Sequence, residues 1–152
     1  LESHGLVREF FTSDENFGVF QRFIAEPRNK AVLSAALKDK PGWTAKAFMD
    51  IVKTEEGRMR LANAMVDQNG NEIICSLAES PASEQCIFTL LNCGNPSDPQ
   101  DKPGVDVMAK VMAQEGSKSA VTKIIWAIAK NRRFGLKKGL PDIPPEMVDA
   151  VG

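Results

Sequence analysis

The side chains that most often carry out catalysis are scarce and scattered in this sequence. A nucleophilic serine or cysteine needs a base beside it, but the one histidine is His4, close to the start of the chain. The three cysteines, Cys75, Cys86 and Cys93, do not supply with His4 the four closely spaced ligands of a zinc site. The sequence also lacks a glycine-rich phosphate loop. We therefore expect no enzyme, no metal and no other cofactor.

Asn92 is the first residue whose type and position are suited to binding. It lies four residues after Phe88 in the segment CIFTLLNCGN (86–95), so a helix would bring the two onto one face. An amide both donates and accepts hydrogen bonds. Asn92 therefore either caps the end of its own helix or binds the backbone of an extended ligand.

A second candidate is the basic segment KNRRFGLKK (130–138). Its cations are Lys130, Arg132, Arg133, Lys137 and Lys138, grouped around Phe134. They could form a solvated surface at the C-terminus of a helix, where the helix dipole favours positive charge. They could instead bind an acidic protein or the phosphates of a nucleic acid. Because the rest of the chain has no matching basic stripe, nucleic acid is the weaker of these two partners.

The composition is that of a soluble protein. The chain has 152 residues, of which 43% are hydrophobic and 26% are charged, and its net charge is −1. It has no apolar run of about 18 residues, which a membrane span would need. Unpaired cysteines indicate free thiols in a reducing compartment, so we expect a cytoplasmic protein. The start LESHG resembles a remnant of cloning, and we expect residues 1–12 to be disordered and 13–152 to be one domain cut from a larger protein.

Apolar residues recur with helical period along most of the chain, and the alternation typical of strands is hard to find. A capping box, Thr12-x-x-Glu15, predicts one helix start, and Asn29 and Thr54 predict two more. The segment DQNGN (67–71) predicts a turn. The fold class expected from these patterns is all-α.

Three predicted helices share a pattern that suggests a repeat. Their aromatic residues are Phe48, Phe88 and Trp126, at intervals of 40 and 38 residues, and each has apolar neighbours at matching places. A shorter helix precedes each one. A period near 40 residues with two or three helices is typical of an α-solenoid, in which stacked units share one core.

The segments NEIICSLAESPASEQCIFTLLN (71–92) and GVDVMAKVMAQEGSKSAVTKIIWAIAKN (104–131) resemble the second and third helices of armadillo repeats. The resemblance covers roughly residues 29–131, and HEAT repeats are the close alternative. In armadillo repeats the third helix carries an aromatic followed four residues later by Asn, as at Phe88 and Asn92. The first and third units depart from this, with Val52 and Lys130 at the position of the Asn. The resemblance implies a right-handed α–α superhelix of about three repeats.

The resemblance further implies a non-enzymatic scaffold that binds a protein or peptide, which could be acidic, in a groove lined by the third helices. The candidate partner-binding residues are Phe48, Gln85, Phe88, Asn92, Trp126, Lys130, Arg132 and Arg133. Trp126 is either a groove residue flanked by cations or part of the core. Two other functions stay open: a compact helical bundle acting as a regulator or effector, and a nucleic-acid-associated module using segment 130–138.

Overall fold

The chain is helical throughout most of the residues that the structure describes. The computed structural model describes residues 3–93, 97–98 and 100–135. These residues form nine helices and no strand, and the all-α prediction is confirmed. The helices are α1 (Ser3–Phe10), α2 (Asp14–Ala25), α3 (Pro27–Asp39), α4 (Pro41–Ile51), α5 (Glu55–Val66), α6 (Gln68–Glu79), α7 (Glu84–Asn92), α8 (Pro103–Met112) and α9 (Ser117–Gly135).

Polar side chains fix the starts of three helices. Thr54 caps α5 as predicted, because its hydroxyl accepts a hydrogen bond of 2.9 Å from the Gly57 amide. The cap of α2 is Ser13 rather than Thr12, since the Thr12 hydroxyl instead donates to the carbonyl oxygen of Glu9. The predicted turn at 67–71 is wrong. The Asp67 carboxylate accepts hydrogen bonds from two backbone amides and so begins α6 there.

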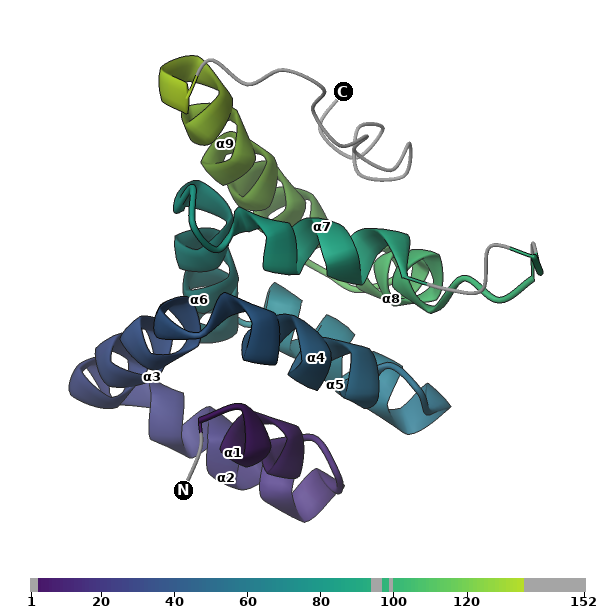
Figure 1. Ribbon diagram of the computed structural model, residues 1–152. Helices are drawn as coiled ribbons and strands as arrows, with labels where there is room; N and C mark the ends of the chain where they lie inside the picture. The colour runs from purple at the N-terminus through teal and green to yellow at the C-terminus, as the bar shows by residue number, and fades with distance from the viewer. Residues whose placement is uncertain (1–2, 94–96, 99, 136–152) are drawn as a thin grey trace.

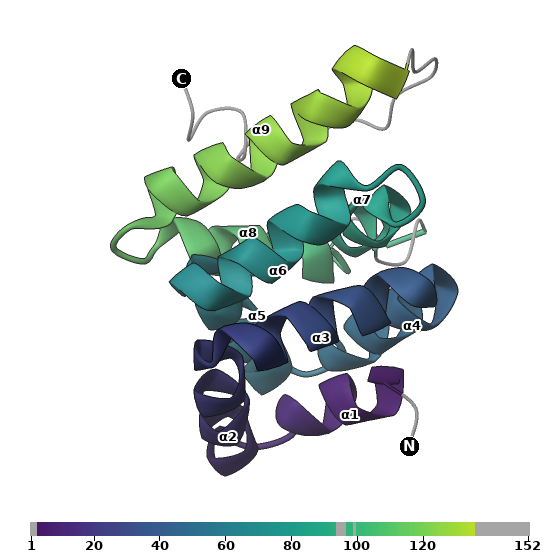
Figure 2. The ribbon, with the colours of Figure 1, turned by 90° about the vertical axis from the view of Figure 1, so that its left-hand side faces the viewer.

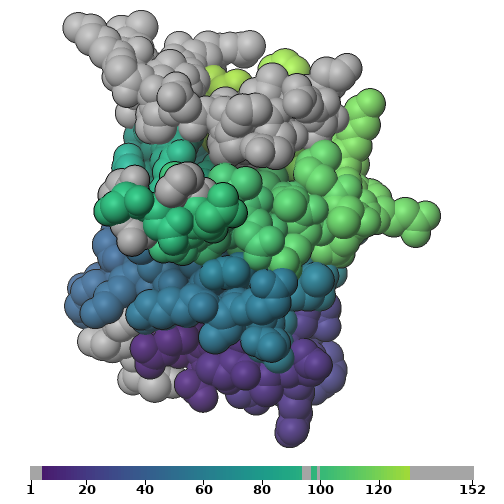
Figure 3. Space-filling view, turned by 90° about the vertical axis from the view of Figure 1, so that its right-hand side faces the viewer, coloured from purple at the N-terminus to yellow at the C-terminus, as the bar shows by residue number. Residues whose placement is uncertain are grey.

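The helices pack in three rows, and within each row a helix contacts the one three places further along the chain. Figure 1 shows the row α1–α4–α7, and Figure 2 shows the row α3–α6–α9. The third row is α2–α5–α8. In the space-filling view of Figure 3 the colours follow chain order from one end of the molecule to the other. Helices close in sequence therefore lie in the same layer, and successive layers follow one another along the stack.

Ion pairs join helices of the same row. The Lys30 ammonium group on α3 lies 2.6 Å from the Glu72 carboxylate on α6. In the row α2–α5–α8, Lys110 lies 2.5 Å from the Glu55 carboxylate. In both pairs the carboxylate is exposed and the lysine is largely covered, and a partly exposed pair contributes on the order of 1 kcal/mol. The larger contribution to stability comes from the apolar contacts between the rows.

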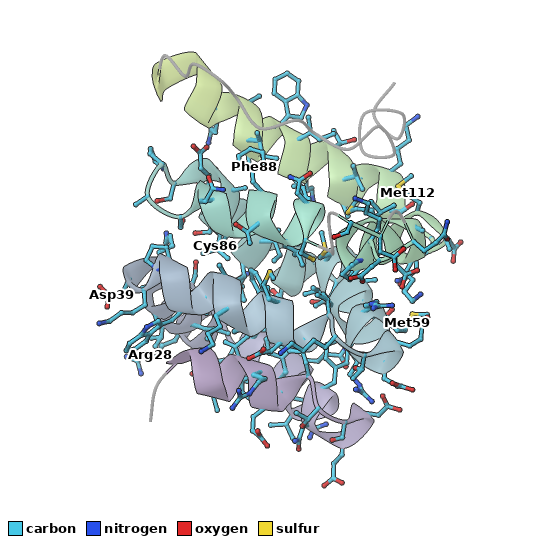
Figure 4. The ribbon with its side chains drawn as sticks, turned by 45° about the vertical axis from the view of Figure 1, so that its right-hand side comes forward. Arg28, Asp39, Met59, Cys86, Phe88 and Met112 are labelled. Atoms are coloured by element: carbon cyan, nitrogen blue, oxygen red, sulfur yellow. The ribbon has the colours of Figure 1, made fainter. Side chains whose placement is uncertain are left out.

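One continuous hydrophobic core runs through the layers. Its largest fully buried side chains include Ile24, Leu61, Met65, Leu77, Ile87, Leu90, Leu91, Met108, Ile124 and Ile128. Cys86 on α7 points toward α4, and its thiol donates a hydrogen bond to the Pro41 carbonyl oxygen (Figure 4). Free cysteine therefore acts here as a small core residue.

Helix α1 and the residues just after it belong to this core, whereas the sequence predicts disorder over residues 1–12; residues 1 and 2 lie outside the described part of the chain. Helix α1 buries Val7 and Phe10, and Phe11 just after it is 5% exposed. The Phe11 ring lies 5.4 Å from that of Phe17 and 5.1 Å from that of Phe20, measured between centroids. Aromatic contacts at such distances add to the stabilisation from burial. They fix α1 and α2 against each other.

The predicted equivalence of Phe48, Phe88 and Trp126 is not found. Phe48 on α4 and Phe88 on α7 lie on neighbouring helices of one row and are each 3% exposed. Trp126 lies on α9, which packs against α6, in a different row. The interval of 38 residues matched because α7 ends at Asn92 and α8 begins only at Pro103, so this long connection takes up about the length of one helix. The order of the rows, however, places α9 above α6 rather than α7.

Candidate site: the groove between α6 and α9

A groove of about 550 Å³ lies between α6 and α9. The residues on which its chemistry depends are Asn71, Cys75 and Glu79 from α6, and Lys123, Trp126 and Lys130 from α9. Two helices of one row therefore form its walls. Among the predicted binding residues whose side chains the structure describes, Trp126 and Lys130 line it and the others do not.

Trp126 is the most exposed large hydrophobic residue among those that the structure describes, with 62% of its surface exposed. At 3.6 residues per turn it lies about 200° around α9 from Ile124, which is fully buried. The sequence leaves open whether Trp126 is a groove residue or a core residue. Its exposure shows that it is a surface residue and not part of the core. An exposed Trp beside a groove is a common feature of protein-binding surfaces.

Charged groups line both walls of the groove. The Lys130 ammonium group lies 3.4 Å from the Glu79 carboxylate, with 63% and 44% of these side chains exposed. Glu72, also on α6, is held by Lys30, whose hydrogen bond lowers the pKa of that carboxyl group. Lys123 is exposed and has no ion pair with any residue in the described part of the chain. It is therefore the groove cation most readily available to a ligand.

A buried amide holds the two walls together. Asn71 is 3% exposed, and its side-chain nitrogen donates hydrogen bonds of 3.1 Å to the carbonyl oxygens of Met65 and Ala120. Its side-chain oxygen accepts from the Cys75 thiol at 3.6 Å. Sequence reasoning missed Asn71, because Asn and Gly in DQNGN indicate a turn as strongly as they indicate a capped helix start.

The Cys75 thiol is held in its protonated form. Burial, followed by the nearby charge of Glu79, raises the pKa of Cys75 to about 11. Thiolates, and not thiols, are the reactive nucleophiles. The arrangement therefore suits a polar wall of a binding groove better than covalent chemistry. No cluster of three metal-ligating side chains occurs among the residues described.

The remaining predicted site residues lie elsewhere. Phe48 and Phe88 are core residues and have no surface to offer a partner, which corrects their assignment to a groove (Figure 4 shows Phe88 inside the packed helices). The Asn92 side chain donates to the Phe88 carbonyl oxygen at 2.9 Å and thus satisfies its own helix end. Gln85 is exposed on α7, a helix of another row.

The basic segment 130–138 is described only in part. Residues 132 and 133 continue α9, but the side chains of Arg132 and Arg133 lie outside the described residues, as do Lys137 and Lys138 entirely. Lys130 is the one cation of this segment whose position in the groove is defined.

Comparison of the chain with models of protein families, with curated proteins and with solved structures gave no match. The groove is therefore interpreted from its own geometry and chemistry.

Proposed function

We propose that the chain is a non-enzymatic module of armadillo-like or HEAT-like helical repeats that binds a partner protein in the groove between α6 and α9. The observation that carries this proposal is the 62% exposure of Trp126 beside that groove. Burying apolar surface is favourable by about 25 cal/mol for each Å², and the exposed part of the indole does not gain this free energy in the isolated chain. Contact with a partner would recover part of that free energy.

The row packing supports a superhelical stack over a closed bundle. In a stack each helix contacts its counterparts in the preceding and following units, as α6 contacts α3 and α9. In a closed four-helix bundle the helices surround one axis instead. The units supported by the rows are α2–α3–α4 and α5–α6–α7, followed by α8–α9, with α1 preceding them. The row α3–α6–α9, rather than the row of Phe48 and Phe88, then carries the binding surface.

Site-specific photo-crosslinking tests the proposed function. A photoreactive amino acid would replace Trp126 in one variant and Lys46 in a control, since Lys46 is exposed on α4. Both variants would be irradiated in cells of the source organism. We expect a defined protein to crosslink to position 126 and not to position 46. Equal labelling at the two positions, or labelling at position 46 alone, would rule out the groove as the binding site.

A further inference from the structure

Helix α9 carries charge of one sign. Its sequence, SKSAVTKIIWAIAKNRRFG, contains Lys118, Lys123, Lys130, Arg132 and Arg133 and no acidic residue. The whole chain has nearly equal numbers of acidic and basic residues, 20 and 19. The positive charge is therefore concentrated on the helix that presents Trp126. Complementary charge on the partner would favour association at this helix.

The opposite wall of the groove does not fully neutralise this charge. Glu72 is paired with Lys30, and Glu79 is paired with Lys130 in an exposed contact at 3.4 Å. Lys123 lies three residues before Trp126 and has no paired carboxylate among the residues described. Besides the hydrogen bond from Lys30, the charge of Lys123 helps to lower the pKa of Glu72, but no carboxylate lies within ion-pair distance of Lys123 in the described part of the chain. A ligand carboxylate could therefore bind Lys123 directly, and a second carboxylate could displace Glu79 from Lys130.

The amide nitrogens of Asn71 and Asn92 are not free to bind the backbone of an extended peptide. The Asn71 amide nitrogen already donates to two carbonyl oxygens, and its oxygen accepts from the Cys75 thiol. Asn92 bonds to its own helix. Recognition of a peptide backbone through these asparagines is thus not supported here, in keeping with Val52 and Lys130 at the positions of the Asn in the first and third predicted units. The groove groups suited to an acidic ligand are the ammonium groups of Lys123 and Lys130, which lie beside the indole of Trp126.

We propose that the partner presents a segment with acidic side chains on both sides of an apolar one. The apolar side chain packs on Trp126, one carboxylate binds Lys123, and a neighbouring carboxylate replaces Glu79 at Lys130. This inference rests on the proposed function and specifies the partner of the same groove. A nucleic acid fits less well, because Glu72 and Glu79 on the facing wall repel a continuous row of phosphates more strongly than they repel two separate carboxylates.

Calorimetric titration of the purified protein with synthetic peptides tests this inference. The probe is a capped decapeptide in which glutamates and aspartates flank a central Leu-Phe pair. One control peptide replaces every acid by its amide, and another replaces Leu-Phe by Ala-Ala. We expect the acidic apolar peptide to bind more tightly than either control, and its affinity to fall as salt is added. Equal binding of the acidic and amide peptides, or no binding of any peptide, would overturn the proposal.

Charge variants give predictions of opposite sign. We expect Lys123→Gln to weaken binding of the probe by about threefold, as for one partly exposed ion pair. We expect Glu79→Gln to strengthen binding by about twofold or more, because it removes a competitor for Lys130 and a repulsive charge. Lys46→Gln on α4 is the matched control and should leave affinity unchanged. The proposal is wrong if Glu79→Gln weakens binding or has no effect, or if Lys123→Gln and Lys46→Gln behave alike.

The outcomes separate this inference from the proposed function. If a protein crosslinks at position 126 but the acidic peptide does not bind, the groove is a binding site and the chemistry assigned to its partner is wrong. If neither occurs, the proposed function fails as well. A ten-nucleotide single strand of thymidine is the nucleic-acid control. If it binds more tightly than the acidic peptide, the groove is a nucleic-acid site and the inference is wrong.

Discussion

The Asn71 side chain on α6 donates a hydrogen bond of 3.1 Å to the carbonyl oxygen of Ala120 in the first turns of α9. The bond joins two helices through residues that are 49 positions apart in the sequence. The same nitrogen donates to the Met65 carbonyl oxygen near the end of α5. One buried amide on α6 thus holds α9, the other wall of the groove, and α5 in place.

Replacing Asn71 by Ala should destabilise the protein. The change leaves two buried carbonyl oxygens without this donor, and a loss of about 1–3 kcal/mol in the free energy of unfolding is expected. Urea denaturation followed by circular dichroism measures it. Gln21→Ala, at an exposed position on α2, is the control and should change stability by less than about 0.5 kcal/mol. Equal stability of the two variants would show that the bond to Ala120 contributes little.

Trp126→Ala and Phe88→Ala should differ sharply in stability. Phe88 is 3% exposed, so its truncation leaves a cavity and should cost about 3–5 kcal/mol. Trp126 is 62% exposed, and its truncation should cost less than about 1 kcal/mol. Thermal melts of the two variants give the comparison. A large fall in melting temperature for Trp126→Ala would contradict its surface position.

Gly104 marks a close approach of α8 to α7 that only glycine permits. A Cβ atom at this position would overlap the Leu90 carbonyl oxygen and lie 2.6 Å from that of Leu91. Gly104→Ala should therefore destabilise the protein by about 1–3 kcal/mol. A Cβ atom at Gly42, at the start of α4, would have no atom within 4 Å, apart from its own helix backbone and chain neighbours.

Gly42→Ala is thus the matched control for the same chemical change. Because alanine favours helix more than glycine does, this variant should be as stable as the wild type or more stable, by up to about 1 kcal/mol. Chemical denaturation of both variants tests the pair. The packing described for α7 and α8 would be wrong if both substitutions had the same effect.

Local patterns were sufficient to predict the helical class, but not the order of the rows. The Thr54 cap and the apolar stripe of α9 follow from residues close in sequence, and these features could be predicted. Which helix α9 contacts depends on packing across layers, and α8 and α9 correspond in the stack to α5 and α6. For this reason the sequence pattern pairs Trp126 with Phe88, although the two lie in different rows.

The groove itself was only partly predictable. The combination of Trp126 and Lys130 follows from their spacing of four residues on one helix. Glu79 lies 51 residues from Lys130 in the sequence, and nothing local connects the two. Asn71 lies in the segment DQNGN (67–71), whose composition is found both in turns and at capped helix starts, so its role could not be predicted. Its role depends on Ala120, which only the fold brings near.

Cys75 should react slowly with alkylating reagents below pH 9. Its pKa is about 11 in the folded chain, against 9.0 for a free thiol, because burial disfavours the thiolate. The thiolate fraction at pH 8 falls about a hundredfold, while each thiolate becomes several-fold more nucleophilic, so alkylation should slow about tenfold. Mass spectrometry of Cys75 after iodoacetamide treatment, with and without urea, measures the ratio.

The raised pKa of Cys75 also predicts the direction of a pH effect. A group whose pKa is raised on folding contributes stability that is present below pH 9 and is lost as the pH rises through about 11. Cys75→Ser should reduce the loss of stability between these values. An unchanged pH profile in this variant, or equal alkylation rates with and without urea, would contradict the environment described for the thiol.

The central claim is tested most directly by binding of the partner protein that crosslinking at position 126 identifies, purified in its free form. Its dissociation constant would be measured for the wild type, for Trp126→Ala and for Trp43→Ala, a control on α4 where the tryptophan is 42% exposed. We expect Trp126→Ala to weaken binding about tenfold or more while Trp43→Ala leaves it near the wild-type value. Wild-type affinity in a folded Trp126→Ala variant would contradict the assignment of the groove between α6 and α9 as the partner site.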